Sequence, residues 1–202
     1  MGQYYETLFI DERQWMYPLD YGCSGLKLTE HSWVGGSYRN GVIAHLMKLG
    51  ECHMVHIGDY SEKDMDTLVP PKDAIEVEGQ LVSGKAMYDM CWTSGIEDKF
   101  KMPRISDFDI NEFRWKKKIW IADEELQEYI ECPFDIEEDD KWEICPLLIL
   151  LAIGNGQGGG DYHGTNMDNV GTWAFHKIKV YYEEPHWMCN LEENGPLFKE
   201  DY

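Results

Sequence analysis

Basic residues are scarce in this sequence, and their shortage excludes several classes of partner. The 202 residues include 18 Lys and Arg against 38 Asp and Glu, for a formal net charge of -20. Nucleic-acid backbones and anionic membrane surfaces attract basic proteins and repel acidic ones. We therefore expect neither direct nucleic-acid binding nor membrane binding. The charge is compatible with an acidic face that binds a basic protein.

The motifs that define common enzymes and metal sites are also missing. The six cysteines form no C-x-x-C pair, and neither H-E-x-x-H nor G-x-S-x-G occurs. His53 and His56 would lie on opposite faces of a strand, which makes them a poor chelating pair. We assign no catalytic residue and no metal ligand. The cofactor stays unknown, and the sequence favours a non-catalytic protein over an enzyme.

Export and membrane signals are absent as well. No apolar run approaches the ~20 residues that span a bilayer, and no secretory signal peptide is present. The Met-Gly start resembles a myristoylation site, but Glu6 stands where Ser or Thr is required. We expect a cytoplasmic protein with reduced thiols.

Hydrophobic periodicity predicts one α+β domain over residues 1–202. It would be β-dominated, with mostly antiparallel strands and about two short helices. Expected strands cover 4–10, 25–33, 52–57, 74–82, 119–121, 146–153 and 170–182. Expected helices are 37–49, with Ser37 as N-cap, and a short one after Asp123 with Leu126, Tyr129 and Ile130 inward.

Two parts of the chain look alike, which suggests an internal duplication. Residues 4–60 and 119–182 each contain strands around a glycine turn that ends in Tyr, and 61–115 would be an insertion. The halves would then meet at a pseudo-twofold seam, a favourable place for a ligand cleft. Chance similarity in a β-rich chain is the alternative.

A glycine-rich loop after the most apolar run is the strongest candidate for a functional surface. Five glycines fall within residues 154–160, and no Lys follows them, so the phosphate-loop motif is incomplete. Such a loop can bring backbone N–H groups to an anion, or simply turn a corner where a Cβ would not fit. We place a ligand here, held by Gly156, Gly158, Gly159, Gly160, Asp161, Tyr162, His163, Glu30, His31 and Asp59.

Several motifs resemble a known family. They are the start Met1-Gly2-Gln3-Tyr4-Tyr5 and the stretches at 25–35, 58–60 and 154–162. Together they look like a family of small uncharacterised proteins from bacteria and from mobile elements such as phages. The resemblance implies no activity. It implies a host cytoplasm as the place of action if the chain is phage-encoded.

Three functions remain open. The first is a binding protein whose glycine loop takes the phosphate of a small polar or nucleotide-like ligand, with Tyr162 or Trp173 stacking on it. The second is a phage or mobile-element inhibitor that docks an acidic surface on a basic host protein of defence or nucleic-acid binding. Residues 123–143 carry eleven acids and one Lys, which suits such docking. The third is a metal-dependent hydrolase using carboxylates and imidazoles.

Overall fold

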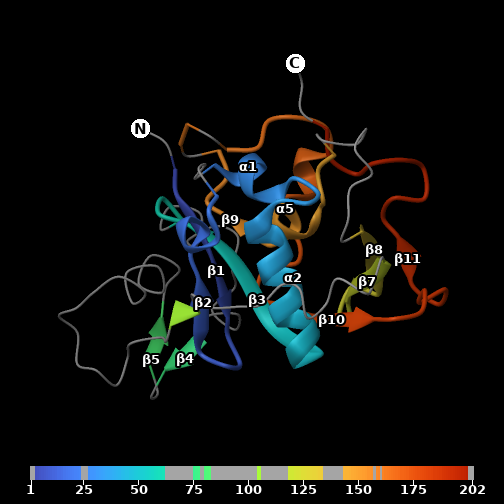
Figure 1. Ribbon diagram of the computed structural model, residues 1–202, viewed down its shortest axis with the longest axis horizontal. Coiled ribbons are helices and arrows are strands. Elements are labelled where there is room, and N and C mark those ends of the chain that lie inside the picture. Colours follow the sequence, from blue (N-terminus) through green and yellow to red (C-terminus); the bar gives the residue numbers. More distant parts are fainter. Residues whose placement is uncertain are drawn as a thin grey trace.

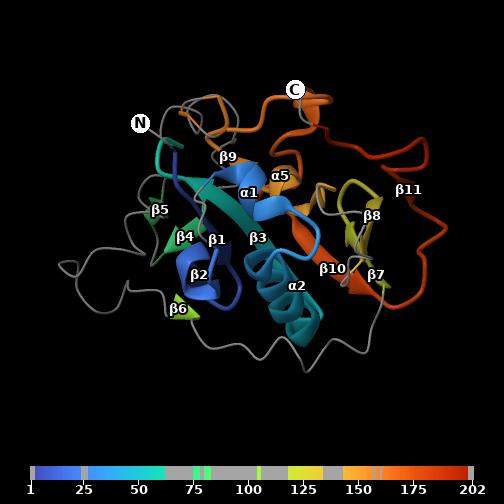
Figure 2. The ribbon, with the colours of Figure 1, turned by 45° about the horizontal axis from the view of Figure 1, so that its top comes forward.

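A nine-stranded sheet, mostly antiparallel, forms the centre of the molecule, and helices pack over one of its faces (Figure 1 and Figure 2). The computed structural model describes residues 3–23, 27–61, 75–77, 80–82, 104–105, 118–133, 143–156, 158–159 and 161–199. The strands in sheet order are β11 (Cys189–Asn190), β8 (Glu128–Pro133), β7 (Lys118–Asp123), β10 (Lys177–Tyr181), β3 (Glu51–Gly58), β1 (Tyr5–Phe9), β2 (Gln14–Met16) and β6 (Arg104–Ile105); β9 (Ala152–Ile153) pairs with β3. The expected α+β class is therefore confirmed.

The helices are few and short. They are α1 (Leu28–Ser32), α2 (Ser37–Leu49) and α5 (Leu147–Leu150), with 3₁₀ turns η1 (Pro18–Tyr21) and η5 (Met167–Asn169). A separate hairpin joins β4 (Ile75–Val77) to β5 (Gln80–Val82). Among the described residues, no helix combines the length and the apolarity needed to cross a membrane.

Strand alternation divides the apolar side chains of β1 and β3 between two cores. Tyr5 and Phe9 of β1 join the main core beneath the helices, whereas Leu8 joins a smaller core on the other face. On β3, Met54 belongs to the main core and Val55 to the smaller one. This period of two is the pattern that predicted both strands.

The two ends of the sheet have the same strand order. In one half β1 pairs antiparallel with β2 and with β3; in the other β7 pairs antiparallel with β8 and with β10. The returning strands β3 and β10 are antiparallel neighbours in the middle. A duplication of 4–60 and 119–182 requires this shared order, and common origin stays a prediction. The glycine turns have different neighbours, since Gly158 lies against Gln3 and Tyr60, whereas a Cβ at Gly36 would meet the Trp33 carbonyl.

Two predicted elements have the wrong type. Residues 28–32 of the predicted strand 25–33 form helix α1, which packs beside α5 and buries Leu28. The predicted helix after Asp123 is the turn of the β7–β8 hairpin. Asp123 Oδ1 does accept the backbone N–H groups of Glu125 and Leu126, at 2.8 and 3.0 Å, but it caps a turn.

Three further predictions need smaller corrections. The apolar run 146–153 contains helix α5 followed by the two-residue strand β9. The predicted strand 170–182 shortens to β10, preceded by turns. The predicted strand 74–82 is instead the pair β4 and β5, and the rest of the expected insertion 61–115 is described only at Ser61 and β6.

Candidate functional site

The glycine-rich loop is closed around a carboxylate of its own chain. Asp161 Oδ2 accepts hydrogen bonds from the backbone N–H groups of Gly156 (2.7 Å) and Gly158 (2.8 Å). Asp161 Oδ1 accepts the Tyr5 hydroxyl at 3.1 Å, and the side chain is buried. The backbone donors that were expected to hold a ligand phosphate therefore already hold an anion.

Close packing explains why the loop needs glycine. The buried side chain of Gln3 lies against Gly58, Gly154 and Gly158, and a Cβ at these positions would approach Gln3 atoms within 2.0, 2.4 and 2.7 Å. Gly154 also has φ = +98°, a conformation that L side chains rarely adopt. The Gln3 N–H donates to the Gly159 carbonyl at 3.0 Å. Gly160 lies outside the described residues.

The aromatic residues expected to stack on a ligand are buried. Tyr162 is fully enclosed, and its hydroxyl is bonded to the carbonyls of Thr165 and Lys199, both at 2.8 Å. Trp173 is also fully enclosed, and its Nε1–H donates to Glu128 Oε2 at 3.1 Å. A ligand ring would have to displace these contacts to stack on either side chain.

His31 meets His56 in a buried cluster beneath α2. His31 Nδ1 lies 3.4 Å from His56 Nε2, and His56 Nδ1 lies 2.9 Å from Thr7 Oγ1. The Tyr38 hydroxyl donates to that oxygen at 2.7 Å. Burial lowers the pKa of His56 well below its ordinary value, and the neighbouring His31 lowers it further. The His56 ring is therefore neutral, and it forms part of a closed hydrogen-bond chain.

The other predicted ligand residues do not join this cluster. Glu30 accepts the backbone N–H of Lys27 at 3.1 Å and closes the first turn of α1. Asp59 Oδ1 accepts the Tyr4 N–H at 3.1 Å, as turn aspartates commonly do. The side chain of His163 is exposed. Across the described part of the chain, no group of three or more His, Cys, Asp or Glu side chains could hold a metal ion.

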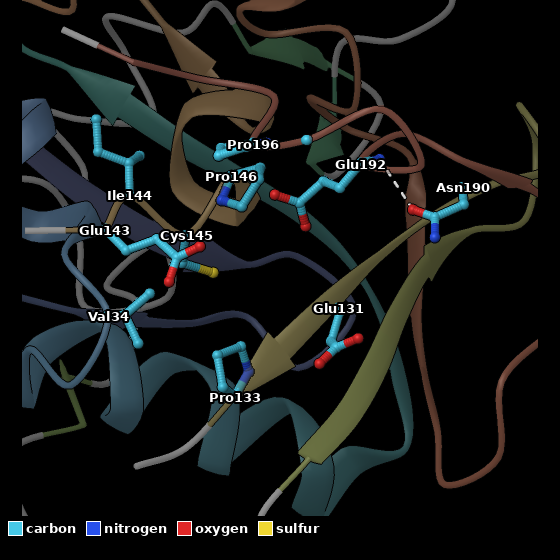
Figure 3. A pocket seen from close by; sticks show the side chains of 11 residues that line it. Val34, Glu131, Pro133, Glu143, Ile144, Cys145, Pro146, Asn190, Glu192 and Pro196 are labelled. Atoms are coloured by element: carbon cyan, nitrogen blue, oxygen red, sulfur yellow. Dashed lines mark hydrogen bonds between the residues drawn. The ribbon is translucent and has the colours of Figure 1, made fainter. Parts of the chain in front are cut away.

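A pocket of about 330 Å³ opens elsewhere, between the end of β8, β11 and residues 143–146 (Figure 3). Three carboxylates line it: Glu131, Glu143 and Glu192. The apolar part of its wall consists of Val34, Pro133, Ile144, Pro146 and Pro196. No basic residue is among the described residues that line it.

Hydrogen bonds hold the walls of this pocket in place. The Val34 N–H donates to the Glu143 carbonyl, and the Cys145 N–H donates to the Ser32 carbonyl, each at 2.8 Å. These bonds fix residues 143–145 to the end of α1. On the other side, the Glu192 N–H donates to Asn190 Oδ1 at 2.9 Å (Figure 3).

The carboxylates of the pocket differ in how their negative charge is neutralised. Glu131 Oε2 lies 2.5 Å from Lys118 Nζ in a half-exposed ion pair. Burial raises the pKa of Glu192 to about 7, and the charges of Cys145 and Glu143 act in the same direction. Glu131 is thus paired with a lysine and Glu192 is partly protonated near neutral pH, and a bound cation would favour the ionised form of Glu192.

Sequence reasoning missed this pocket because its walls come from segments that are far apart in the chain. A usable signal was present. Cys132-Pro133 and Cys145-Pro146 are two Cys-Pro pairs that flank the acidic stretch, and all four residues lie at or beside the pocket. Comparison with protein-family models, curated proteins and solved structures finds no match.

Proposed function

We propose that this protein is a non-catalytic binding protein that takes a basic group, such as a lysine or arginine side chain of a partner, into the acidic pocket. One observation carries the proposal: three carboxylates line a 330 Å³ pocket in which no described residue is basic. That volume falls within the range of about 300 Å³ or more that is typical of ligand sites. The net charge of -20 attracts basic partners at long range.

The shape of the pocket suits an amphipathic basic side chain. Val34, Ile144 and Pro146 offer apolar surface to an aliphatic stem. Glu143 and Glu192 offer carboxylate oxygens to the charged head, and a guanidinium can bind carboxylates through two parallel hydrogen bonds. The binding protein expected from the sequence is thus retained, with its site moved away from the glycine loop.

This function unites two of the expectations drawn from sequence. A basic host protein would supply the lysine or arginine, as the inhibitor hypothesis requires, and the surrounding acidic surface would steer it. Phage or mobile-element origin stays a proposal that rests on the family resemblance. Nucleotide binding at the glycine loop stays a prediction, and it would require displacement of Asp161 from two amides.

Titration calorimetry with a minimal probe tests the proposal. Nα-acetyl-arginine methylamide should bind the full chain with a dissociation constant in a measurable range, and the uncharged norleucine analogue should not. The double variant Glu143→Gln/Glu192→Gln should weaken binding about tenfold, which corresponds to ~1.4 kcal/mol. Equal binding of both probes would contradict the proposal.

A matched control separates the pocket from the general negative charge. The variant Glu12→Gln/Glu125→Gln removes two exposed carboxylates at the β1–β2 and β7–β8 turns, neither of which lines the pocket, and changes the formal net charge equally. It should bind the arginine probe nearly as well as the unmodified chain. If it loses as much affinity as the pocket variant, binding is a bulk charge effect and the pocket has no special role.

A further inference from the structure

Two buried thiols face each other beside the pocket, and one of them, Cys145, forms part of the pocket floor. Cys132 Sγ and Cys145 Sγ lie 3.5 Å apart, and both residues are buried. Cys132 lies on β8, where it pairs with Ile119 of β7. Cys145 is held against α1 by its N–H bond to Ser32, and it is part of the pocket lining (Figure 3). A small molecule in the pocket can therefore reach Cys145.

A buried cation lies beside the two sulfurs. Arg39 of α2 is fully enclosed, and its Nη1 donates to the Pro133 carbonyl (2.6 Å) and to Asn40 Oδ1 (2.7 Å). Its Nε and Nη2 have no hydrogen-bond partner among the described residues. Burial acts to lower the pKa of Arg39, but the Cys145 and Cys132 sulfurs more than offset this and leave it raised.

A charge of this kind needs a nearby anion, because an unpaired buried guanidinium is very costly. Within the described part of the chain, the two thiols are the groups whose charges raise the pKa of Arg39. A hydrogen bond from Cys132 lowers the pKa of Cys145 to about 5; burial opposes this, and the charge of Arg39 and the Leu147 N–H support it. Burial raises the pKa of Cys132 well above its ordinary value. The two shifts have opposite directions, so Cys145 is the more acidic thiol of the pair and the better nucleophile.

We propose that Cys132 and Cys145 are a reversible redox pair, which hydrogen peroxide or another small neutral hydroperoxide oxidises to a disulfide through the pocket. The proposal goes beyond basic-group binding and does not depend on it. A neutral oxidant is required because Glu131, Glu143 and Glu192 would repel an anionic one such as glutathione disulfide.

The chemistry balances in two steps. The Cys145 thiolate attacks one peroxide oxygen; an S–O bond forms, the O–O bond breaks and hydroxide leaves, giving a sulfenic acid. The Cys132 thiol loses its proton to the leaving hydroxyl and attacks that sulfur; the S–S bond forms, the S–O bond breaks and water leaves. Two sulfurs are each oxidised by one electron, and the peroxide is reduced to water and hydroxide. The sulfurs must move closer by about 1.5 Å to reach the length of a disulfide.

The same geometry makes the disulfide easy to reduce. Oxidation removes the thiolate, so Arg39 loses the charge that compensates it inside the protein. Stabilisation of the reduced form makes a disulfide more oxidising. We therefore expect a switch that mild reductant reverses, unlike a structural disulfide.

Peptide mapping after peroxide treatment tests the pair. The reduced full chain, treated with a small excess of hydrogen peroxide and then with N-ethylmaleimide, should show a Cys132–Cys145 link that dithiothreitol removes. Cys132→Ser should instead accumulate a sulfenic acid at Cys145 that a 1,3-diketone probe traps. Cys189→Ser, at an exposed thiol, should leave the link intact. A link between any other two cysteines would overturn the proposal, as would free Cys132 and Cys145 beside an oxidised Cys189.

The rate of oxidation tests the part that Arg39 plays. The described ionisable groups near Cys145 are Cys132 from β8, Arg39 from α2, and Glu143 and Glu192 from the pocket wall. Arg39→Gln should slow oxidation at neutral pH at least about tenfold, as expected when a thiolate loses its stabilising cation. If that variant does not fold, the pH profile of the unmodified chain decides. The rate should be nearly constant from pH 6 to 8, and a rise through the ordinary thiol range would overturn the role of Arg39.

Discussion

The glycine loop and the pocket floor both bury a charge, but they compensate it from different distances along the chain. Asp161 finds two of its donors at Gly156 and Gly158, five and three residues away, and a third at the Tyr5 hydroxyl. Arg39 has its carbonyl partner at Pro133, 94 residues away, and faces two sulfurs from separate segments. The backbone donors near Asp161 close the glycine loop around its carboxylate. The groups around Arg39 come from distant segments, and a pocket remains open beside Cys145.

The comparison teaches where functional groups are to be sought in this fold. A glycine-rich loop is conspicuous in a sequence, yet its flexibility is used here for packing around Gln3 and Asp161. The chemically available groups are instead Cys145 and Glu192, which have shifted pKa values and line open volume. Shifted titration beside a cavity is a general marker of functional sites.

The largest effect is expected from removing the carboxylate of the glycine loop. Asp161→Ala leaves two backbone N–H groups and the Tyr5 hydroxyl without their acceptor. Each unpaired buried group costs about 1–3 kcal/mol, so we expect a loss of ~3 kcal/mol in urea unfolding. Asp168→Ala, at an exposed position, should change stability little. If Asp161→Ala is equally mild, the loop is not held by its own carboxylate.

A pair of glycine variants isolates the packing around Gln3. Gly154 and Gly156 have similar φ values, +98° and +93°, but an added Cβ would approach Gln3 Nε2 within 2.4 Å at Gly154 and meet nothing within 4 Å at Gly156. Each alanine should destabilise the folded protein by about 1 kcal/mol through backbone strain. Gly154→Ala should cost a further ~1–3 kcal/mol from overpacking, measured by urea unfolding. Equal losses would show that packing contributes nothing.

At the pocket, Glu192→Gln should stabilise the protein at high pH. The folded pKa of about 7 lies above the ordinary 4.5, so the protonated side chain favours folding. That contribution is complete below about pH 4.5 and is lost as the pH rises through 7. The variant should therefore be more stable than the unmodified chain by about 1–3 kcal/mol at pH 8 and equal to it near pH 4. Glu193→Gln, at an exposed position, is the matched control. A gain that does not depend on pH would contradict the raised pKa.

The smallest effect concerns binding. Protonation of Glu192 removes one negative charge from the pocket, so affinity for Nα-acetyl-arginine methylamide should fall about threefold between pH 8 and pH 6. In Glu192→Gln this dependence should nearly vanish. Calorimetry at both pH values measures the change, and an unaltered pH dependence in the variant would assign it to another group.

Much of the frame could be predicted from the sequence. Residues 4–10, 52–57 and 119–121 alternate clearly and form β1, β3 and β7, and residues 37–49 form α2. The elements predicted incorrectly are those whose local structure depends on contacts with distant parts of the fold. The run 146–153 is buried on every side, so its periodicity did not distinguish a helix from a strand. Asp123 serves as a turn cap as readily as a helix cap, and the pairing of β7 with β8 determined which.

The candidate site was less predictable for a related reason. Glycine and aspartate within residues 154–161 predict a turn. The sequence does not show whether a ligand or the chain's own side chains bind the backbone N–H groups of that turn. The contact of Cys132 with Cys145 depends on the β7–β8 hairpin. The sequence instead predicted a short helix after Asp123, where the turn of this hairpin lies. Once that hairpin is in place, the two Cys-Pro pairs come together at one end of the sheet.

Amide chemical-shift mapping by NMR tests most directly whether the pocket, and not the glycine loop, is the binding surface. Two probes are titrated into the full chain: Nα-acetyl-arginine methylamide and adenosine monophosphate. The cationic probe should shift the amides of Glu131, Cys145 and Glu192, and the nucleotide should leave Gly156 and Gly158 unmoved. Nucleotide-dependent shifts at those two glycines, with no response of the pocket amides to the cation, would contradict the account.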